Sequence, residues 1–454
     1  MKEYDVIVIG SGSGLSLTYR ALSQNMKVAL VAKDYLGGTC FNVGCVPSKT
    51  LIHAADIIRC VYDAQRFGID AKVNSINFPV IMNKMRSRVK SGTESIGRDL
   101  KDEKNLDLYQ EEGRFIGDYT MVAGSEEMRG KTIFIASGAR PAIPPIKGIN
   151  DVRYLTNESV LALTELPKSM VIIGGSYIGV EYAHFFAAMG CEVSVIEYAD
   201  SLVPFEEPEI SEFLRGSLEK RMTILTGHEA MEIAQDGNEI ILTILDRKTK
   251  ETTHVKGAEV LVATGRRSNA DRLDLDKTGV SLTGKGFIEV DNYLRTSKAG
   301  IMAIGDATGK GMFTHAADKE VEIAWNNAFK KEKIPMDFAA VPHAVYTDPQ
   351  IASIGLTESQ AAKDHSISVG RASYRDTVAG DIRMADDGFA KAIIEKDTGR
   401  ILGFHIIGPE APVLIQEVVN VFTQKGSYRT IVDAMHIFPS LTDLITETFA
   451  NIDE

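Results

Sequence analysis

Two closely spaced cysteines are the residues whose types and spacing most directly suggest chemistry. Cys40 and Cys45 lie in the run GGTCFNVGCVPSK, residues 37–49, with four residues between the two thiols. Thiols at this spacing can close a small disulfide loop. We expect a helix to begin at Cys45, because Pro47 and Ser48 are tolerated in a first helical turn. The positive end of that helix would lower the pKa of a thiol and favour the thiolate.

Other roles for this pair fit the sequence less well. A structural zinc site normally has four ligands, and the remaining cysteines, Cys60 and Cys191, are isolated. A purely structural disulfide is more typical of secreted proteins. Two inert buried thiols are an open alternative. The flanking glycines and Lys49 favour a redox-active pair, and we expect no metal site.

A glycine-rich turn near the N-terminus lies between a predicted strand and a predicted helix. The strand ends at Gly10, and Gly12 and Gly14 follow before an Ala- and Leu-rich helix and a second strand at residues 27–31. Gly10 permits a tight turn, and Gly12 lets the backbone approach a pyrophosphate that the helix N-terminus holds. Strand, turn, helix and second strand together predict a dinucleotide site.

Two positions of this unit depart from the usual fingerprint. Leu15 occupies the third small position, with Gly14 one residue early, and Ala32 occupies the strand end where an acidic residue normally binds the ribose. Asp34, two residues further along, is the candidate that could reach a ribose by a different path. The departures concern the adenosine end of the site and leave the phosphate cradle intact.

A second unit of the same kind begins about 160 residues after the first. Gly174 and Gly179 occupy the first and third glycine positions, with Ser176 at the middle one. The next strand ends at Glu197, where a carboxylate would accept ribose hydroxyls and repel a 2′-phosphate. Residues 198–204 contain no Arg or Lys, which favours NAD(H) over NADP(H). A solvent-facing glutamate at a strand end is the alternative.

Two dinucleotide sites and a dithiol in one chain have a joint interpretation. One site would hold a fixed flavin and the other a diffusible nicotinamide, and the flavin would pass electrons between the nicotinamide and the thiols.

Length, composition and charge limit the class of protein. A chain of 454 residues with 44% hydrophobic and 25% charged residues predicts two to four globular domains. The net charge of −12 argues against nucleic acid or an anionic membrane as a partner. No apolar run approaches the roughly 18 residues needed to span a bilayer. The first strand leaves no room for a signal peptide, and four cysteines suit the cytoplasm, so we expect a cytoplasmic protein.

The dithiol and both glycine units resemble the pyridine nucleotide-disulfide oxidoreductases, over essentially the whole chain. This family includes dihydrolipoamide dehydrogenase, glutathione and mycothione reductases, and mercuric reductase. Four further segments resemble the family in the same order, at residues 133–141, 262–269, 304–307 and 345–355. The resemblance implies an α/β fold with two Rossmann-like domains, for FAD and NAD(H), and a C-terminal α/β dimerisation domain.

The resemblance also implies a domain order and a homodimer. The FAD-binding domain would comprise residues 1–147 and 266–338, the NAD-binding domain residues 148–265, and the dimerisation domain residues 339–454. In this family the partner subunit's C-terminal segment completes the active site. We therefore expect a homodimer that acts on a small-molecule or protein-bound disulfide or dithiol.

Several residues acquire catalytic roles from the resemblance. Cys45 would lie beside the flavin as its charge-transfer thiol, and Cys40 would exchange with the substrate, as hydride passes between nicotinamide, flavin and the cysteine pair. Lys49 would pair with Glu181, since a buried Lys–Glu pair is costly unless both partners are present. Tyr177 would cover the nicotinamide pocket, and a packed aromatic residue at a helix start is the alternative.

The resemblance places further residues at the two cofactors. Besides the residues already named, they are Gly38, Thr39, Ser137, Gly138, Gly175, Ile178, Gly265, Arg266, Gly305, Asp306 and Ala316. Asp306 matches the aspartate that hydrogen-bonds the ribityl chain of FAD.

The C-terminal segment departs from the disulfide reductases at a catalytic position. Those enzymes relay a proton through a histidine held by a glutamate, and Phe438 and Asp443 occupy these two positions. A phenyl ring cannot carry a proton, and loss of the relay should cost roughly 10²–10⁴-fold in proton-transfer catalysis. His436 is the candidate substitute, and a helix-capping or exposed histidine is the alternative.

Three functions are open from the sequence, and we expect the first. It is an NADH-linked dithiol/disulfide oxidoreductase of the dihydrolipoamide dehydrogenase type with an altered proton relay. The second is a flavin–dithiol reductase of a metal ion or another oxidant. Mercuric reductases also have Phe-Pro at residue 438, but they finish with a Cys-Cys tail, and this sequence has no cysteine after Cys191. The third is a redox-sensing or binding flavoprotein with slow turnover.

Overall fold

The first sheet is built around a strand that is buried on both faces. In the computed structural model, which describes residues 1–386 and 388–453, β1 (Lys2–Ile9) pairs in parallel with β2 and β6. The strand order is β3–β2–β1–β6–β5–β4, with β16 also paired to β6. The other strands of this sheet are β2 (Val28–Val31), β3 (Leu106–Tyr109), β4 (Gly113–Gly117), β5 (Thr120–Ala123), β6 (Glu126–Ile135) and β16 (Ile301–Ala303). Continuous apolar runs such as Val6 to Ile9 suit parallel strands that helices cover.

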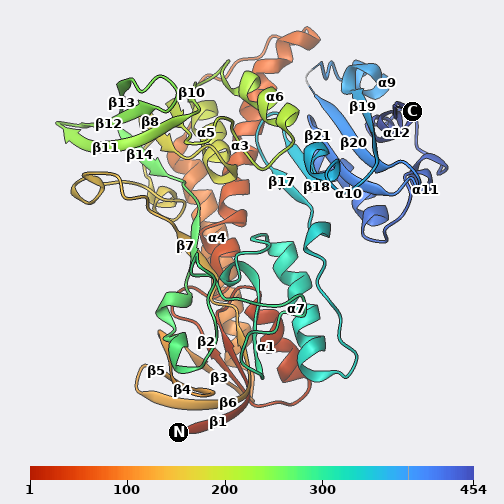
Figure 1. Cartoon of the computed structure of the whole chain (residues 1–454). Coiled ribbons are helices and arrows are strands. Elements are labelled where there is room, and N and C mark those ends of the chain that lie inside the picture. Colours follow the sequence, from red (N-terminus) through yellow and green to blue (C-terminus); the bar gives the residue numbers. More distant parts are fainter. Residues whose placement is uncertain (387, 454) are drawn as a thin grey trace.

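Long helices connect this sheet to the rest of the molecule. α1 (Gly14–Ser23) follows the first glycine turn, and Asn25 after it has the left-handed φ of 56° that suits a helix end. α3 (Cys45–Asp63) and α4 (Phe78–Lys101) run from the first sheet toward the second (Figure 1). The other helices of this part are α2 (Gly38–Asn42) and α7 (Thr314–Phe329).

The second sheet repeats the parallel architecture on a smaller scale. Its order is β10–β9–β8–β14, and an antiparallel sheet β11–β12–β13 accompanies it. β7 (Ala139–Pro141) and β15 (Arg266–Ser268) pair where the chain enters and leaves this part. The remaining elements are β8 (Ser169–Ile173), α5 (Tyr177–Met189), β9 (Glu192–Ile196), α6 (Pro208–Leu218), β10 (Thr223–Leu225), β11 (His228–Asp236), β12 (Glu239–Asp246), β13 (Thr252–Gly257) and β14 (Glu259–Val262).

The C-terminal part is an antiparallel sheet with helices beside it. The order is β17–β18–β21–β20–β19, and α10 and α12 pack against its strands (Figure 1). Its elements are β17 (His343–Val345), β18 (Ile351–Gly355), α8 (Glu358–Ala361), β19 (Ile367–Ser373), α9 (Val378–Ile382), β20 (Phe389–Glu395), β21 (Ile401–Ile407), α10 (Ala411–Phe422), α11 (Arg429–Val432) and α12 (Asp443–Ala450).

These sheets confirm the expected fold class of two nucleotide-binding units and a C-terminal α/β unit. The domain boundaries at residues 147, 265 and 338 stay a prediction. Every helix in the described part of the chain is too short or too polar to cross a bilayer.

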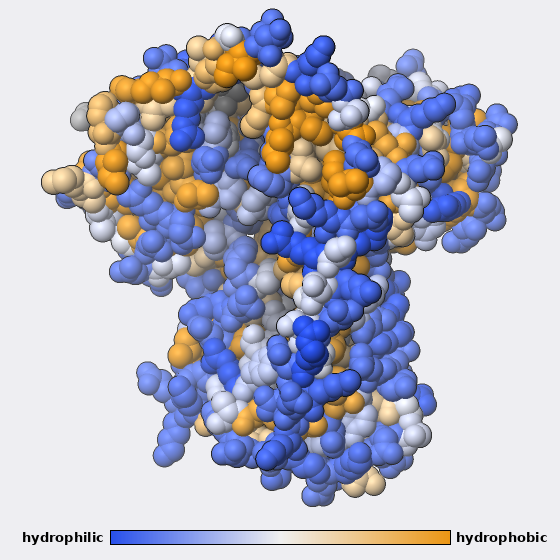
Figure 2. Space-filling model, turned by 180° about the vertical axis from the view of Figure 1, so that it is seen from behind, coloured by the Kyte–Doolittle hydropathy of each residue, from blue (hydrophilic) through white to orange (hydrophobic). Residues whose placement is uncertain are grey.

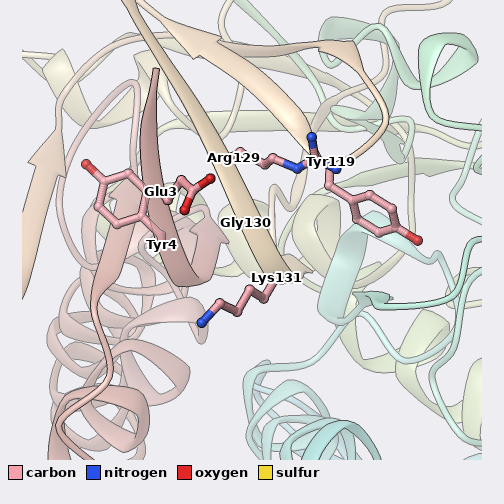
Figure 3. A pocket seen from close by; sticks show the side chains of 6 residues that line it. All are labelled: Glu3, Tyr4, Tyr119, Arg129, Gly130 and Lys131. Carbon is pink, nitrogen blue, oxygen red and sulfur yellow. The ribbon is translucent and has the colours of Figure 1, made fainter.

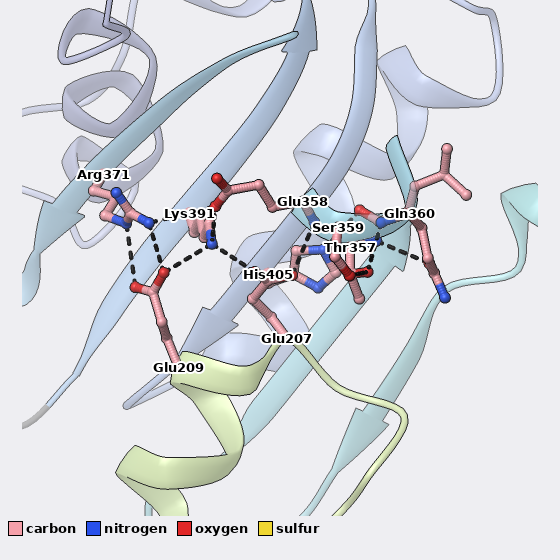
Figure 4. Close-up of polar contacts among 10 residues, drawn as sticks. Glu207, Glu209, Thr357, Glu358, Ser359, Gln360, Arg371, Lys391 and His405 are labelled. Atoms are coloured by element: carbon pink, nitrogen blue, oxygen red, sulfur yellow. Dashed lines mark hydrogen bonds and ion pairs between the residues drawn. The ribbon is translucent and has the colours of Figure 1, made fainter. Parts of the chain in front are cut away.

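A buried lysine ties the second unit to the C-terminal sheet. The side chain of Lys391, on β20, is 1% exposed, and its Nζ lies 2.5 Å from Glu207, 2.8 Å from Glu209 and 2.6 Å from Glu358 (Figure 4). Glu207 and Glu209 stand at the start of α6, whereas Glu358 begins α8. The three carboxylates are close enough to hold a cation, and the Lys391 ammonium lies among them.

We predict that Lys391→Ala lowers the free energy of unfolding by about 3–5 kcal/mol, because removing one partner leaves the buried Glu207 carboxylate without its cation. Denaturant unfolding of the holoenzyme measures this change. Lys396→Ala is the matched control, since Lys396 is exposed and makes no ion pair among the described residues. Equal stability of the two variants would contradict the prediction.

Candidate active site

The two cysteines lie where two helices meet. Cys40 is in α2, Cys45 is the first residue of α3, and both are free thiols in this structure. Gly44 makes the tight turn between them possible. A Cβ at Gly44 would lie 2.9 Å from the carbonyl oxygen of Thr39 and 3.2 Å from the Cα of Cys40. The turn therefore brings the thiols within hydrogen-bonding reach of each other.

The two thiols differ in acidity. The hydrogen bond with Cys40 lowers the pKa of the Cys45 thiol to about 6 against the opposing effect of burial. The Thr314 hydroxyl, whose Oγ1 lies 3.6 Å from Cys45 Sγ, and the charge of Lys49 lower this pKa further. The same hydrogen bond, together with burial, raises the pKa of the Cys40 thiol. At neutral pH the pair therefore consists of a Cys45 thiolate and a Cys40 thiol.

An ion pair fixes the positive charge near Cys45. Lys49 Nζ lies 2.8 Å from Oε1 and 2.6 Å from Oε2 of Glu181. The Glu181 side chain is only 8% exposed, and it also accepts the backbone N–H of Tyr346 at 3.0 Å. Lys49 belongs to α3 and Glu181 to α5, so the expected pair is present and spans the two nucleotide units.

The first glycine turn has contacts that only glycine allows. Gly10 has a φ of 104°, and a Cβ there would lie 2.1 Å from the carbonyl oxygen of Ala136. Gly38 packs against Gly12, since a Cβ on Gly38 would lie 2.5 Å from the Cα of Gly12. The backbone is therefore open toward a ligand at this turn, as a pyrophosphate cradle requires.

The two departures from the fingerprint have different structural answers. Gly14 starts α1, and a Cβ there would lie 2.9 Å from a methyl group of Val8. The displaced glycine therefore still permits close packing of the helix on β1. Asp34 is exposed and lines a cavity of about 480 Å³ with Tyr35 and Arg98. Its role at a ribose stays a prediction.

A buried hydroxyl beside this turn has no partner. The Oγ of Ser137 is buried and makes no hydrogen bond among the described residues. Ser137 directly follows Ala136, which contacts Gly10, and precedes Gly138, which has a φ of 67°. Buried polar atoms are normally satisfied, so this hydroxyl suits a polar ligand on the first turn. The first site therefore fits FAD.

A second buried polar group lies across the same site. Arg266 Nε donates to Asp306 at 3.2 Å, and burial raises the pKa of the Asp306 carboxyl. Glu320, on α7, has no sequence pattern that predicts it at this site; it accepts the N–H of Gly305, and its buried Oε1 has no hydrogen-bond partner among the described residues. Burial raises the pKa of Glu320 to about 7, helped by the nearby Asp306 charge.

The second glycine turn has the same construction. Gly174 has a φ of 110°, and a Cβ there would lie 2.4 Å from the carbonyl oxygen of Ala263. A Cβ on Gly179 would lie 1.8 Å from the carbonyl oxygen of Gly174. The middle position, Ser176, precedes α5 in an extended conformation. The first and third glycines therefore still allow the close backbone contacts of this turn, although the middle position is a serine.

Glu197 lies directly after β9 and holds this turn. Its carboxylate accepts the N–H of Gly175 at 2.5 Å and that of Ala199 at 2.6 Å. The carboxylate is therefore at the turn, where the sequence predicts a ribose. The other expected residues are distributed over the two sites, with Thr39 in α2, Ile178 in α5, Gly265 before β15 and Ala316 in α7.

Tyr177, the first residue of α5, is packed in an aromatic cluster that the sequence analysis did not identify. Its ring lies against those of Phe313 and His343. These residues are far apart in the chain, and no spacing pattern links them. Tyr177 thus lies between the second glycine turn and α7.

Within one chain, the structure does not bring His436 to the dithiol. Its Nδ1 lies 3.0 Å from the carbonyl oxygen of Ala434, and its Nε2 lies 2.8 Å from Glu417 Oε1. Both ring nitrogens therefore contact oxygen atoms of the C-terminal part of the same chain, and His436 makes no contact with Cys40 or Cys45 among the described residues. Phe438 is 70% exposed.

A cavity of about 270 Å³ lies apart from these groups. Its lining residues, at the opposite end of β1 from the glycine turn, are Glu3, Tyr4, Tyr119, Arg129, Gly130 and Lys131 (Figure 3). Ligands of parallel sheets bind at the carboxyl ends of the strands. This cavity is therefore not the dinucleotide site.

Comparisons with known proteins agree with this geometry. The family model described as pyridine nucleotide-disulphide oxidoreductase matches residues 4–365, and that of its dimerisation domain matches residues 341–449. The chain is 31% identical to dihydrolipoyl dehydrogenase of Bacillus subtilis, covering 98% of this chain and 97% of the relative. It is 34% identical to mycothione reductase of Mycobacterium tuberculosis, with coverages of 92% and 93%. For mercuric reductase of Staphylococcus aureus the identity is 32%, with coverages of 90% and 75%.

A solved structure shows the same fold. The HOCl-induced flavoprotein disulfide reductase RclA from Escherichia coli, described as a Cu(II) complex, has a TM-score of 0.89 at 26% identity, covering 99% of both chains. The family resemblance, the fold class and the two cofactors are thereby confirmed. The chain belongs to the pyridine nucleotide-disulphide oxidoreductases, which use FAD and NAD(P)H.

Proposed function

We propose that this protein is an NADH-linked dithiol/disulfide oxidoreductase in which Cys45 and Cys40 carry the electrons to or from the substrate. The observation that carries the proposal is the placement of two free thiols where α2 meets α3, within hydrogen-bonding reach of each other and with Cys45 Sγ 3.6 Å from Thr314 Oγ1. This placement lowers the pKa of Cys45 to about 6 and raises that of Cys40. A structural thiol pair has no need of such a difference, whereas thiol–disulfide exchange requires a thiolate.

Residues at both glycine turns would hold the cofactors. Gly10, Gly12, Gly38, Ser137 and Asp306 would bind FAD, which supplies two-electron chemistry between a nicotinamide and the thiols. The dinucleotide would bind at the second turn. The residues that would hold it there are Gly174, Gly179 and Glu197.

The thiols themselves supply the exchange chemistry. Cys40 gives its proton to the Cys45 thiolate through the hydrogen bond between them and attacks one sulfur of a substrate disulfide. The first substrate thiolate leaves, and a mixed disulfide forms on Cys40. Cys45 then releases that proton to solvent and attacks the Cys40 sulfur as a thiolate, which breaks the mixed disulfide, releases the second substrate thiolate and closes the Cys40–Cys45 disulfide. Both departing thiolates take protons from solvent, since Phe438 carries none.

Preference for NADH rests on Glu197, which leaves little room for a 2′-phosphate. A cationic side chain lies near the end of β9, since the Arg247 guanidinium is 4.0 Å from the centroid of the Tyr198 ring. Arg247 also lies 3.7 Å from Asp200, so its charge is partly paired. Comparison of NADH with NADPH in steady-state assays tests this preference.

A homodimer is part of the proposal. The C-terminal segment exposes Met435, Ile437 and Phe438, which are 100%, 82% and 70% exposed. Figure 2 shows apolar residues gathered on the upper part of the molecule, whereas the lower part of this face is largely hydrophilic. The matched dimerisation domain, residues 341–449, contains this segment, and a partner subunit would cover it.

A specific observation favours a second candidate, reduction of a metal ion or another oxidant. His436 contacts Ala434 and Glu417, and Phe438 occupies the position of the relay histidine, so a phenyl ring stands where the family's relay imidazole would be. A mercuric reductase is among the relatives, and the RclA structure is described as a Cu(II) complex. Oxidants that accept electrons without a proton would suit such a site.

The acidity of Cys45 is directly testable. Because its pKa is lowered, the thiolate is the main form above about pH 6 and is lost as the pH falls through that value. In Cys40→Ala the hydrogen bond disappears, and we expect the pKa of Cys45 to rise. Alkylation rates of Cys45 against pH, mapped by mass spectrometry in reduced holoenzyme, measure it. Cys60→Ala is the control, and an unshifted profile in Cys40→Ala would contradict the assignment.

The function itself is tested by turnover. Cys45→Ser should retain bound FAD, seen by its absorbance, but lose NADH-dependent reduction of lipoamide and other disulfides. Full turnover in that variant would refute the proposal. Wild-type turnover only with Cu(II) or other metal ions would support the second candidate. Negligible turnover with every oxidant would leave a redox-sensing flavoprotein.

A further inference from the structure

Tyr177, Phe313 and His343 form a ring stack, and His315 extends it, because its ring lies 5.6 Å from that of Phe313 at an interplanar angle of 16°. The Tyr177 ring centroid is 5.5 Å from that of His343 at an interplanar angle of 27°, and 6.1 Å from that of Phe313. Phe313 and His343 are themselves 5.6 Å apart and inclined by only 12°. The rings of Tyr177, Phe313 and His343 therefore support one another.

The stack has a defined place along the path between the two sites. Tyr177 immediately follows Ser176 of the glycine turn, and Phe313 immediately precedes Thr314, whose hydroxyl contacts Cys45 Sγ. A nicotinamide carried by a dinucleotide on that turn therefore meets the Tyr177 ring on its way toward Cys45. In this structure the Tyr177 ring rests against the Phe313 and His343 rings at that position.

The His343 ring is the platform against which the Tyr177 ring packs, and a buried carboxylate holds His343 in place. His343 Nε2 lies 2.6 Å from Oε1 of Glu206, whose side chain is fully buried. The other carboxylate oxygen of Glu206 accepts the hydroxyl of Ser353 at 2.6 Å. His343 is on β17 and Ser353 on β18, so the platform belongs to the C-terminal sheet, whereas Tyr177 belongs to the second nucleotide unit.

We propose that the Glu206–His343 pair latches Tyr177 over the nicotinamide position, so that part of the dinucleotide's binding energy goes into opening the stack. His343 is then a positioning residue that sets affinity for the nicotinamide half of the dinucleotide and leaves the adenosine half unaffected. This inference rests on the proposed function, because it requires a nicotinamide dinucleotide at the second turn.

The test compares two ligands on the FAD-loaded protein. NAD⁺ carries the nicotinamide, and ADP-ribose lacks it. His343→Gln removes the ring but retains an N–H donor for Glu206, which protects the fold. Loss of one stacked aromatic pair should tighten NAD⁺ binding about two- to tenfold, with the dissociation constant of ADP-ribose unchanged. Isothermal titration calorimetry measures both constants.

Two further variants sharpen the result. His343→Asn also keeps an N–H donor and should behave as His343→Gln does. The FAD content of each variant reports its folding, so the test can be made if only one of the two variants folds. His254→Gln is the matched control, since His254 is an exposed histidine on β13, away from the stack. It should bind both ligands as the wild type does.

The outcomes separate the latch from the proposed function. Unchanged or weaker NAD⁺ binding in the His343 variants would overturn the latch. Equal changes for NAD⁺ and ADP-ribose would overturn it as well, because the residue would then act on the glycine turn as a whole. A wild-type protein that binds neither ligand would instead refute the proposed function, and the latch with it.

Discussion

The junction of the two nucleotide units beside the dithiol depends on a charge pair whose members belong to different units. Lys49 lies one helical turn after Cys45 in α3. Without a partner, its ammonium would attract any nearby anion. The Glu181 carboxylate lies 2.6 Å from the Lys49 ammonium and also accepts a hydrogen bond from the backbone N–H of Tyr346. Burial of an ion pair is costly unless all of its hydrogen bonds are made. The contact that joins α3 to α5 therefore also holds the Lys49 charge near the dithiol.

The surrounding architecture can be understood from that requirement. The groups around the dithiol come from α2 and α3 of the first unit, from α5 of the second unit and from α7, which follows the second unit in the chain. Each parallel sheet presents a glycine turn at the carboxyl end of its first strand, which is where ligands bind. The two turns can serve one dithiol only because the long helices α3 and α4 bridge the sheets (Figure 1).

Local patterns in the sequence predicted many elements of the fold and of the candidate site. Contacts between residues far apart in the sequence could not be predicted. The glycine turns, the two helices that follow them and the start of α3 at Cys45 are written in short patterns of residues. Glu320 and His343 carried no such pattern. A lone glutamate in a helix and a lone histidine at the start of a strand become informative only when folding brings Gly305 or Tyr177 beside them.

The Lys391 cluster has a consequence for how the charges of the junction are balanced. Where many proteins recruit a dissolved divalent ion to neutralise converging carboxylates, this chain encodes the counterion covalently, on β20. Arg371, which is paired with Lys391 across β19 and β20, lies 2.5 Å from Glu209 and 3.5 Å from Glu358, so two cations face three carboxylates. The charge balance of this junction therefore forms as β19 and β20 pack against α6.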